Sequence, residues 1–164
     1  MEPPPHAALA ERFRQDPAKA AVVVRVGTEL RDGMHCRTTA RGHVTEADEP
    51  RSVGGTDTAQ SPVELLLTSF ATCQAVTYRL WADELGIPLD RVGVELEGDL
   101  DLRGFIGLAD DVPAGYSAIR VVVTLEGPAG AGRYRELADA VDRHCPVTDV
   151  LVRPIPVVRE LVLP

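Results

Sequence analysis

Residues 61–86 constrain the fold of this 164-residue chain more than any other segment, because they predict one long helix with a defined beginning and end. Ser61 is followed by Pro62, a residue favoured at the first helical position, and then by Glu64, which completes a capping box. Gly86 supplies the stop signal. The helix is therefore expected to span about 24 residues, or roughly 36 Å.

The middle of this helix carries no charged side chain between Leu65 and Val76. A helix that is apolar on every face is normally buried on every side. One small domain can hardly enclose a helix of that length, so a partner subunit is expected to cover part of it. We therefore predict an obligate homodimer.

Shorter patterns predict strands and helices on either side of the long helix. Helical spacing favours helices over residues 6–15 and 133–143, and β-branched or alternating stretches favour strands over 20–26, 34–45, 92–102, 118–125 and 155–163. Strands and helices segregate instead of alternating, which is typical of the α+β class. We expect an N-terminal tail and short helix over residues 1–19, followed by a single domain over 20–164.

Charge and composition exclude several classes of partner. The net charge of −8 argues against nucleic-acid binding, which needs clustered cations. No apolar run approaches the ~18 residues of a membrane span, and the first residues do not have the pattern of a signal peptide. We therefore expect a cytoplasmic protein without a membrane partner, with its cysteines reduced at rest. His35, Cys36 and His43 lack the spacing of a metal site, so no metal or other cofactor is predicted.

Two cysteines lie in settings that suggest thiol chemistry, although an inert buried cysteine is the commoner case. Cys145 lies in the motif HCPV at 144–147. If Pro146 begins a helix, Cys145 is its cap, and the backbone N–H groups there favour a thiolate. Cys73 lies three turns into the long helix, where burial raises the pKa of a thiol.

A reactive Cys73 therefore needs a cation from elsewhere in the fold, and arginine keeps its charge when buried. Arg37 is the first candidate, with Arg31 and Arg41 as the alternatives. Glu64 is a candidate to orient such an arginine, although its position in the capping box explains it equally without catalysis.

Two stretches together resemble the OsmC/Ohr family. The first is SPVELLLTSFATC at 61–73 with its continuation at 77–82 and 86–89, and the second is the motif at 144–147. The loop at 48–57 looks like the loop before this helix in the OsmC-like branch. The similarity covers residues 20–163.

The resemblance implies a two-layer α+β fold in which two chains intertwine as a homodimer, with long central helices wrapped by antiparallel sheets. It also implies a thiol peroxidase. Cys73 would attack an organic hydroperoxide or peroxide and become a sulfenic acid, and Cys145 would condense with it to form a Cys73–Cys145 disulfide that an external dithiol reduces. An arginine and a glutamate, here Arg37 and Glu64, would assist Cys73.

The chain departs from the family's hydroperoxide-resistance pattern at Val63, where the pattern has the assisting glutamate directly after the proline. One residue corresponds to 100° of helix, so Glu64 does not simply replace it. This departure motivates a second hypothesis, a non-catalytic OsmC-like dimer that binds an apolar small molecule between the Cys73 helix and the segment with Phe105 and Tyr116. A third is a non-redox enzyme with Cys73 as an acyl-accepting nucleophile.

Overall fold

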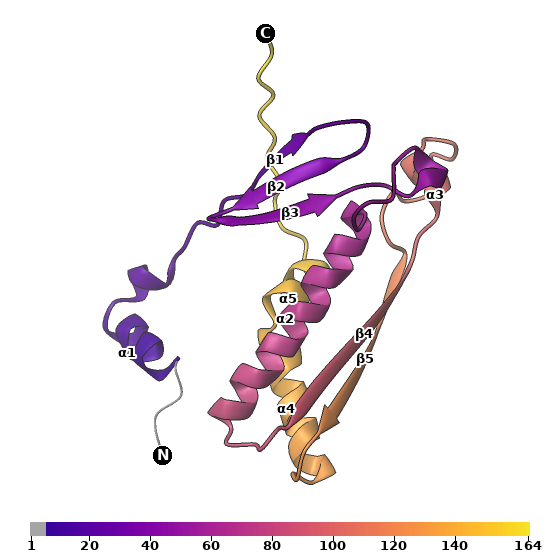
Figure 1. Ribbon diagram of the computed structural model, residues 1–164. Helices are drawn as coiled ribbons and strands as arrows, with labels where there is room; N and C mark the ends of the chain where they lie inside the picture. Colours follow the sequence, from indigo (N-terminus) through magenta and orange to yellow (C-terminus); the bar gives the residue numbers. More distant parts are fainter. Residues whose placement is uncertain (1–5) are drawn as a thin grey trace. The chain divides into compact units, whose positions relative to one another are not determined.

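The computed structural model describes residues 6–164, which form two compact units (Figure 1). The first unit ends at Leu66 and the second runs from Leu67 to Pro164. Residues 1–5 of the expected N-terminal tail lie outside the described residues. The division falls inside the long helix, and the single domain expected over 20–164 stays a prediction.

The first unit contains a short helix and an antiparallel sheet. Helix α1 spans Ala7–Gln15, a 3₁₀ turn follows at Pro17–Ala20, and the sheet has the order β1-β2-β3. The strands are β1 (Gly27–Leu30), β2 (Cys36–Ala40) and β3 (His43–Ala47).

One segment of this unit that was expected to form a single strand forms two strands. Residues 34–45 were predicted to run as one strand, but β2 ends at Ala40 and β3 begins at His43. Arg41 between them has a φ of 57°, in the left-handed region, which reverses the chain at Arg41–Gly42. The two strands then pair in register from Cys36 opposite Ala47 to Ala40 opposite His43.

Asp48 organises the loop that joins β3 to the long helix. Its side chain is 1% exposed, and its carboxylate accepts hydrogen bonds from the backbone and hydroxyl of both Thr56 and Thr58. These bonds, led by the Thr56 hydroxyl, hold the pKa of Asp48 well below its ordinary value, although its burial acts in the opposite direction.

Helix α2 spans Pro62–Glu84 and begins with the predicted capping box. The Glu64 carboxylate accepts from the Ser61 backbone N–H at 2.7 Å, and the Glu64 N–H donates to Ser61 Oγ at 3.4 Å. Gly86, with a φ of 61°, follows the end of the helix as expected.

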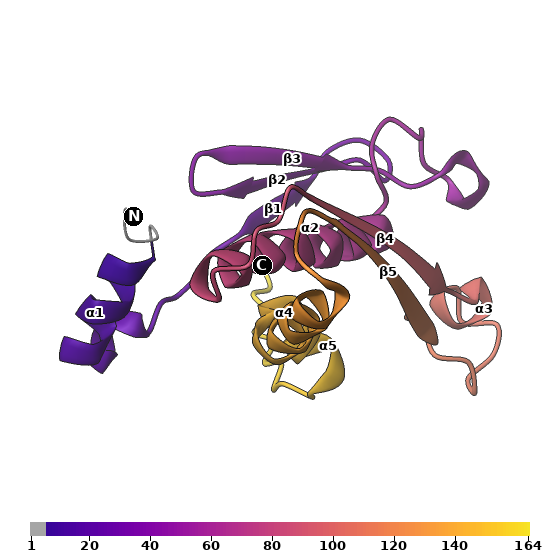
Figure 2. The same ribbon diagram turned by 90° about the horizontal axis from the view of Figure 1, so that it is seen from below.

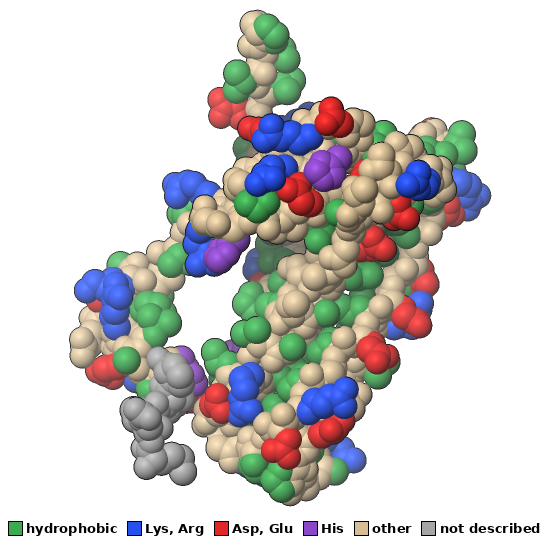
Figure 3. Space-filling model, in the orientation of Figure 1, with side chains coloured by type: hydrophobic (Ala, Val, Ile, Leu, Met, Phe, Trp, Pro, Cys, Tyr) green, Lys and Arg blue, Asp and Glu red, His purple; other side chains and the backbone are tan. Residues whose placement is uncertain are grey.

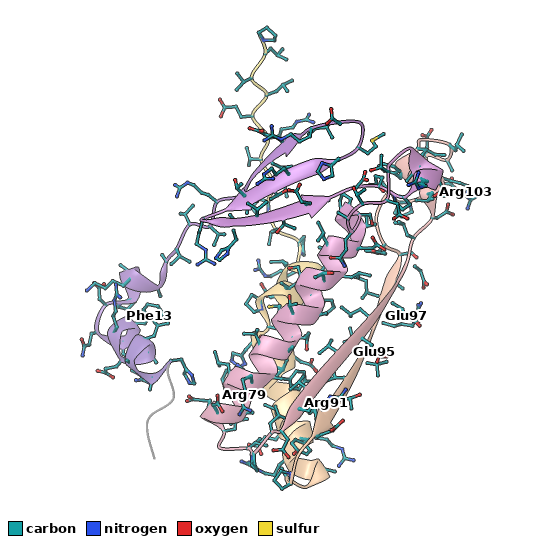
Figure 4. The ribbon with its side chains drawn as sticks, viewed as in Figure 1. Phe13, Arg79, Arg91, Glu95, Glu97 and Arg103 are labelled. Carbon is teal, nitrogen blue, oxygen red and sulfur yellow. The ribbon has the colours of Figure 1, made fainter. Side chains whose placement is uncertain are left out.

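The second unit packs α2 against two helices and a strand pair. Strands β4 (Arg91–Asp99) and β5 (Ala118–Glu126) are antiparallel, with the short helix α3 (Leu102–Phe105) between them in sequence. Helices α4 (Ala131–His144) and α5 (Pro146–Val152) follow one another with only Cys145 between them, and both lie next to α2 (Figure 1 and Figure 2). Arg91, Glu95 and Glu97 mark the solvent side of β4 in Figure 4.

The core of this unit brings α2 and α4 together. Its fully buried side chains include Ala82 from α2, Ile87 from the connection to β4, and Leu137 and Val141 from α4. Partly buried apolar residues of β4 and β5, including Val92, Val123 and Leu125, cover this cluster. Cys145 belongs to the same cluster.

Two expected strands do not form in the structure. Residues 21–26 follow the 3₁₀ turn without regular structure, and residues 154–164 continue from α5 in the same way. The sequence prediction was wrong here because a strand needs a neighbour for its backbone groups, and within the described residues neither segment has one. Both leave β-branched side chains exposed, with Val157 at 88% and Val158 at 93%.

Helix α2 is also more exposed than its composition predicted. Val76 is 67% exposed, Leu66 41% and Leu80 39%. Figure 3 shows hydrophobic side chains gathered at the surface over this helix. No helix within residues 6–164 is both long and apolar enough to cross a membrane.

Candidate functional site

The Sγ atoms of Cys73 and Cys145 lie 3.5 Å apart within the second unit. Cys73 comes from the middle of α2, whereas Cys145 comes from the junction of α4 and α5. Both thiols are free. The distance is a hydrogen-bond contact between sulfurs and is short enough for a disulfide to form with small movements of the side chains.

Backbone geometry holds Cys145 between two helices. Its N–H donates to the Val141 carbonyl at the end of α4, and its carbonyl accepts from the Asp149 N–H at the start of α5. Pro146 is the first residue of α5, so Cys145 is the residue before that helix, as the motif predicted. The extended backbone at Cys145, with φ −75° and ψ 115°, directs its side chain into the core.

Only one of the two sulfurs faces a pocket. A pocket of about 510 Å³ is lined by Cys73 together with apolar side chains of α2 and α5. These are Val76, Leu80 and Trp81 from α2, and Pro146 and Val147 from α5. Cys145 is 1% exposed and does not line this pocket. An incoming small molecule therefore meets Cys73 first, and Cys145 lies behind it.

The two thiols have pKa values displaced in opposite directions. Burial, aided by the contact with Cys145, raises the pKa of Cys73. Burial also acts to raise the pKa of Cys145, but hydrogen bonds from the Thr148 side chain and from the backbone of Thr148 and Val147 outweigh it, and the pKa falls below its ordinary value.

Three neighbours of the cysteines, Gln74, Thr148 and Trp81, were not singled out as site residues from the sequence. Gln74 is 4% exposed and donates through Nε2 to Thr148 Oγ1 at 2.7 Å. The Trp81 and His144 rings lie with their centroids 4.1 Å apart at the edge of the pocket. Gln74 directly follows Cys73 and His144 directly precedes Cys145, and adjacency was the only available signal.

The predicted assisting residues belong to the first unit, where Arg37, Arg31 and Glu64 have partners. Arg37 donates to Glu46 at 2.9 Å across the β2–β3 pair. Arg31 pairs with Glu29, and Arg41 lies in the turn after β2. Glu64 is held by Ser61, whose backbone and side-chain hydrogen bonds lower the Glu64 pKa.

The described residues do not form a metal site. Within residues 6–164 there is no group of three or more His, Cys, Asp or Glu side chains arranged to hold an ion. His35 lies instead within 3.4 Å of Glu46, beside the pair that Glu46 forms with Arg37.

The fold and the paired sulfurs define an α+β protein with a close pair of cysteines, with mixed helices and antiparallel sheets and one thiol of the pair open to an apolar pocket. The sequence model described as "OsmC-like protein" matches residues 55–160, which include both cysteines. The chain therefore belongs to the OsmC-like family. No curated protein sequence gives a significant match.

Solved structures share this fold at low sequence identity. An OsmC-like protein from Mycoplasma pneumoniae is 17% identical, with a TM-score of 0.69 over 80% of this chain and 88% of its own. An organic hydroperoxide resistance protein OsmC from Legionella pneumophila is 18% identical, with a TM-score of 0.61 over 79% and 89%. An organic hydroperoxide resistance protein from Elizabethkingia anophelis is 12% identical, with a TM-score of 0.59 over 79% and 88%.

Proposed function

We propose that this protein is a cysteine-based peroxidase that reduces organic hydroperoxides through a Cys73 sulfenic acid and a Cys73–Cys145 disulfide. The observation that carries the proposal is the pairing of an accessible and a buried sulfur 3.5 Å apart. A sulfenic acid formed on Cys73 has the second thiol within reach, so it is converted to a disulfide before further oxidation.

The reaction has two chemical steps. Cys73 attacks the terminal oxygen of the hydroperoxide, the O–O bond breaks, and the alkoxide leaves and takes a proton to become an alcohol. Cys145 then attacks the Cys73 sulfenic sulfur, forming the disulfide and releasing hydroxide. The sulfur pair loses two electrons and the peroxide gains them, and an external dithiol restores both thiols by exchange.

The pocket supports an organic substrate over hydrogen peroxide. Its lining is largely apolar, and Val76, Leu80 and Val147 offer a surface for an alkyl or aromatic group beside Cys73. Arg37 is our candidate for the cation that stabilises the charge on Cys73 during attack, and Glu64 for the carboxylate that orients it. Separate Arg37→Ala, Arg31→Ala and Arg41→Ala variants rank the three arginines by their peroxide reduction rates.

We also propose that the working form is a homodimer in the cytoplasm, where thiols are kept reduced. The support is the exposed apolar surface of the single chain. Residues 22–26 and 155–163 leave valines and leucines in water, and α2 leaves Leu66 partly uncovered. Exposed apolar segments of this kind mark surfaces that another chain covers.

The pocket also supports a second candidate function, non-catalytic binding of an apolar small molecule by the same dimer. One titration separates the two. Cumene hydroperoxide added to reduced protein should consume two thiols per chain and leave a Cys73–Cys145 disulfide in peptide mass spectra. If cumene hydroperoxide consumes no thiol, or if Cys73→Ser does not prevent the loss, the peroxidase proposal is contradicted. Peroxide-insensitive cysteines together with a co-purified apolar ligand favour the binding protein.

A further inference from the structure

One side-chain hydrogen bond joins α2 to α5 beside the paired sulfurs. Gln74 Nε2 donates to Thr148 Oγ1 at 2.7 Å. Gln74 directly follows Cys73 in α2, and Thr148 lies in the first turn of α5, which begins directly after Cys145. Gln74 is buried and Thr148 is half-buried, so water competes little for this bond. The bond therefore connects the two helices at the place where their sulfurs meet.

The position of Thr148 is tied to that of Cys145 through the backbone. The Asp149 N–H donates to the Cys145 carbonyl at 3.0 Å, so Cys145 and Thr148 belong to one hydrogen-bonded turn. A displacement of this turn moves both residues together. On the other side of the contact, Gln74 and Cys73 are neighbours in the middle of the long helix α2. The bond between the two side chains therefore fixes one sulfur relative to the other.

The rest of α5 has little other attachment to α2. None of its residues is fully buried. Val147 packs against the core, but the apolar side chains of residues 150–152 are exposed. Asp149 forms its ion pair with Arg153, within the same segment. A helix this short is not stable without tertiary contacts, so one buried hydrogen bond is a large part of what holds it in place.

We propose that Gln74 and Thr148 are positioning residues that hold the Cys145 sulfur against Cys73 and so favour the disulfide over the dithiol form. Closing the disulfide shortens the sulfur–sulfur distance from 3.5 Å to about 2.05 Å. Without the bond, the dithiol form gains freedom of motion in α5 that the disulfide form must give up. The effective concentration of one thiol at the other then falls.

This inference deepens the proposed function, because the disulfide equilibrium itself needs no peroxide. Only its role in turnover, where Cys145 must reach the Cys73 sulfenic sulfur, rests on the proposed peroxidase. The coupling is also reciprocal: if the bond favours the disulfide, the disulfide strengthens the bond by the same factor.

The test measures the disulfide equilibrium directly. In a Cys36→Ser background, the protein is equilibrated with mixtures of reduced and oxidised dithiothreitol, and the remaining thiols are alkylated and counted by mass spectrometry. In this exchange the Cys73 and Cys145 thiols lose two electrons and two protons. The disulfide of oxidised dithiothreitol takes them up and opens to a dithiol.

Two variants remove the bond with little change in side-chain volume, Thr148→Val and Gln74→Met. Each should lower the effective concentration about fivefold, the loss expected for one neutral hydrogen bond. This corresponds to a rise of about 20 mV in the reduction potential of the pair. The double variant should fall no further, because the same bond is lost once. Thr148→Ser keeps the hydroxyl and should restore the natural value.

Thr77→Val is the matched control. Its hydroxyl is also buried and donates at 2.7 Å, but to the Cys73 carbonyl within α2, so its loss leaves the attachment of α5 intact. The effective concentration should then stay unchanged. Thermal unfolding of the reduced forms shows which variants are folded, and Thr148→Val, at the less buried position, decides if Gln74→Met does not fold.

Three results would overturn the inference: an unchanged effective concentration in the folded single variants, an equal fall in Thr77→Val, or fully additive falls in the double variant. Failure of the peroxidase proposal is seen separately. In that case cumene hydroperoxide leaves the thiols intact, while the dithiothreitol equilibrium still shifts in Thr148→Val.

Discussion

Cys73 and Cys145 lie 3.5 Å apart, but only Cys73 lines the pocket, while Cys145 is 1% exposed behind it. This arrangement assigns different tasks to two chemically identical side chains. The thiol that lines the pocket can meet a substrate, and the buried thiol can meet only its neighbour. Replacing Cys73 and replacing Cys145 are therefore expected to stop the reaction with peroxide at different steps.

The first prediction concerns the two cysteines. Cys73→Ser should lose all reaction with cumene hydroperoxide, because no other thiol faces the pocket. Cys145→Ser should react once and accumulate a sulfenic acid, which dimedone labels and mass spectrometry locates on Cys73. Cys36→Ser is the control and should still form the disulfide at two thiols per chain. Dimedone labelling of Cys145 in Cys73→Ser would reverse the assignment.

A second prediction concerns substrate size. Val76→Gln places a polar group in the pocket lining and should lower kcat/KM for cumene hydroperoxide by about tenfold, since part of the apolar contact with the substrate is lost. The rate with hydrogen peroxide, which has no alkyl group, should change little. Val122→Gln on β5 makes the same change at an exposed position away from the pocket and serves as the control. Equal losses for both peroxides argue against an apolar subsite.

The third prediction uses Trp81, the one tryptophan in the sequence. Its ring lies 4.1 Å from the His144 ring, and His144 directly precedes Cys145. Closing the disulfide moves Cys145 toward α2, so the intrinsic fluorescence should change when peroxide is added and recover when a dithiol is added. The Cys145→Ser variant should lack the dithiol-reversible phase. An identical response in that variant shows that fluorescence does not follow the disulfide.

A fourth prediction follows from Asp48 and concerns stability against pH. Because its folded pKa lies well below the ordinary value of 3.8, Asp48 contributes stability that is complete above that value and is lost as the pH falls below it. The thermal unfolding midpoint is measured as the pH is lowered from above 3.8 to below it. Over these pH values it should fall more steeply for the natural protein than for Asp48→Asn. Asp111→Asn, an exposed control, should follow the natural protein.

The fifth prediction concerns assembly. The full chain should elute as a dimer at micromolar concentration, because the exposed valines and leucines of 22–26 and 155–163 require cover. Removing residues 155–164 takes away much of this apolar surface and should weaken the dimer without unfolding the core of the second unit. Light scattering after size exclusion measures both species. A monomeric full chain contradicts the proposed dimer.

The sequence alone determined the elements that depend on local contacts. The capping box at Ser61 and Glu64 and the stop at Gly86 predicted α2 to within two residues of its ends, since a helix is stabilised by neighbours along the chain. The cap position of Cys145 before Pro146 followed from the same local reasoning. Family motifs, which are also local, indicated the OsmC-like family correctly.

Only the tertiary structure decided the relations between distant residues. Cys73 and Cys145 are 72 positions apart, and nothing in the chain between them specifies a contact, a shared pocket or which sulfur is covered. Thr148 and Gln74 meet for the same reason, because α5 packs on α2. The segments at 20–26 and 155–163 show the converse: their composition favours strands, but a strand exists only where another chain segment supplies its hydrogen bonds.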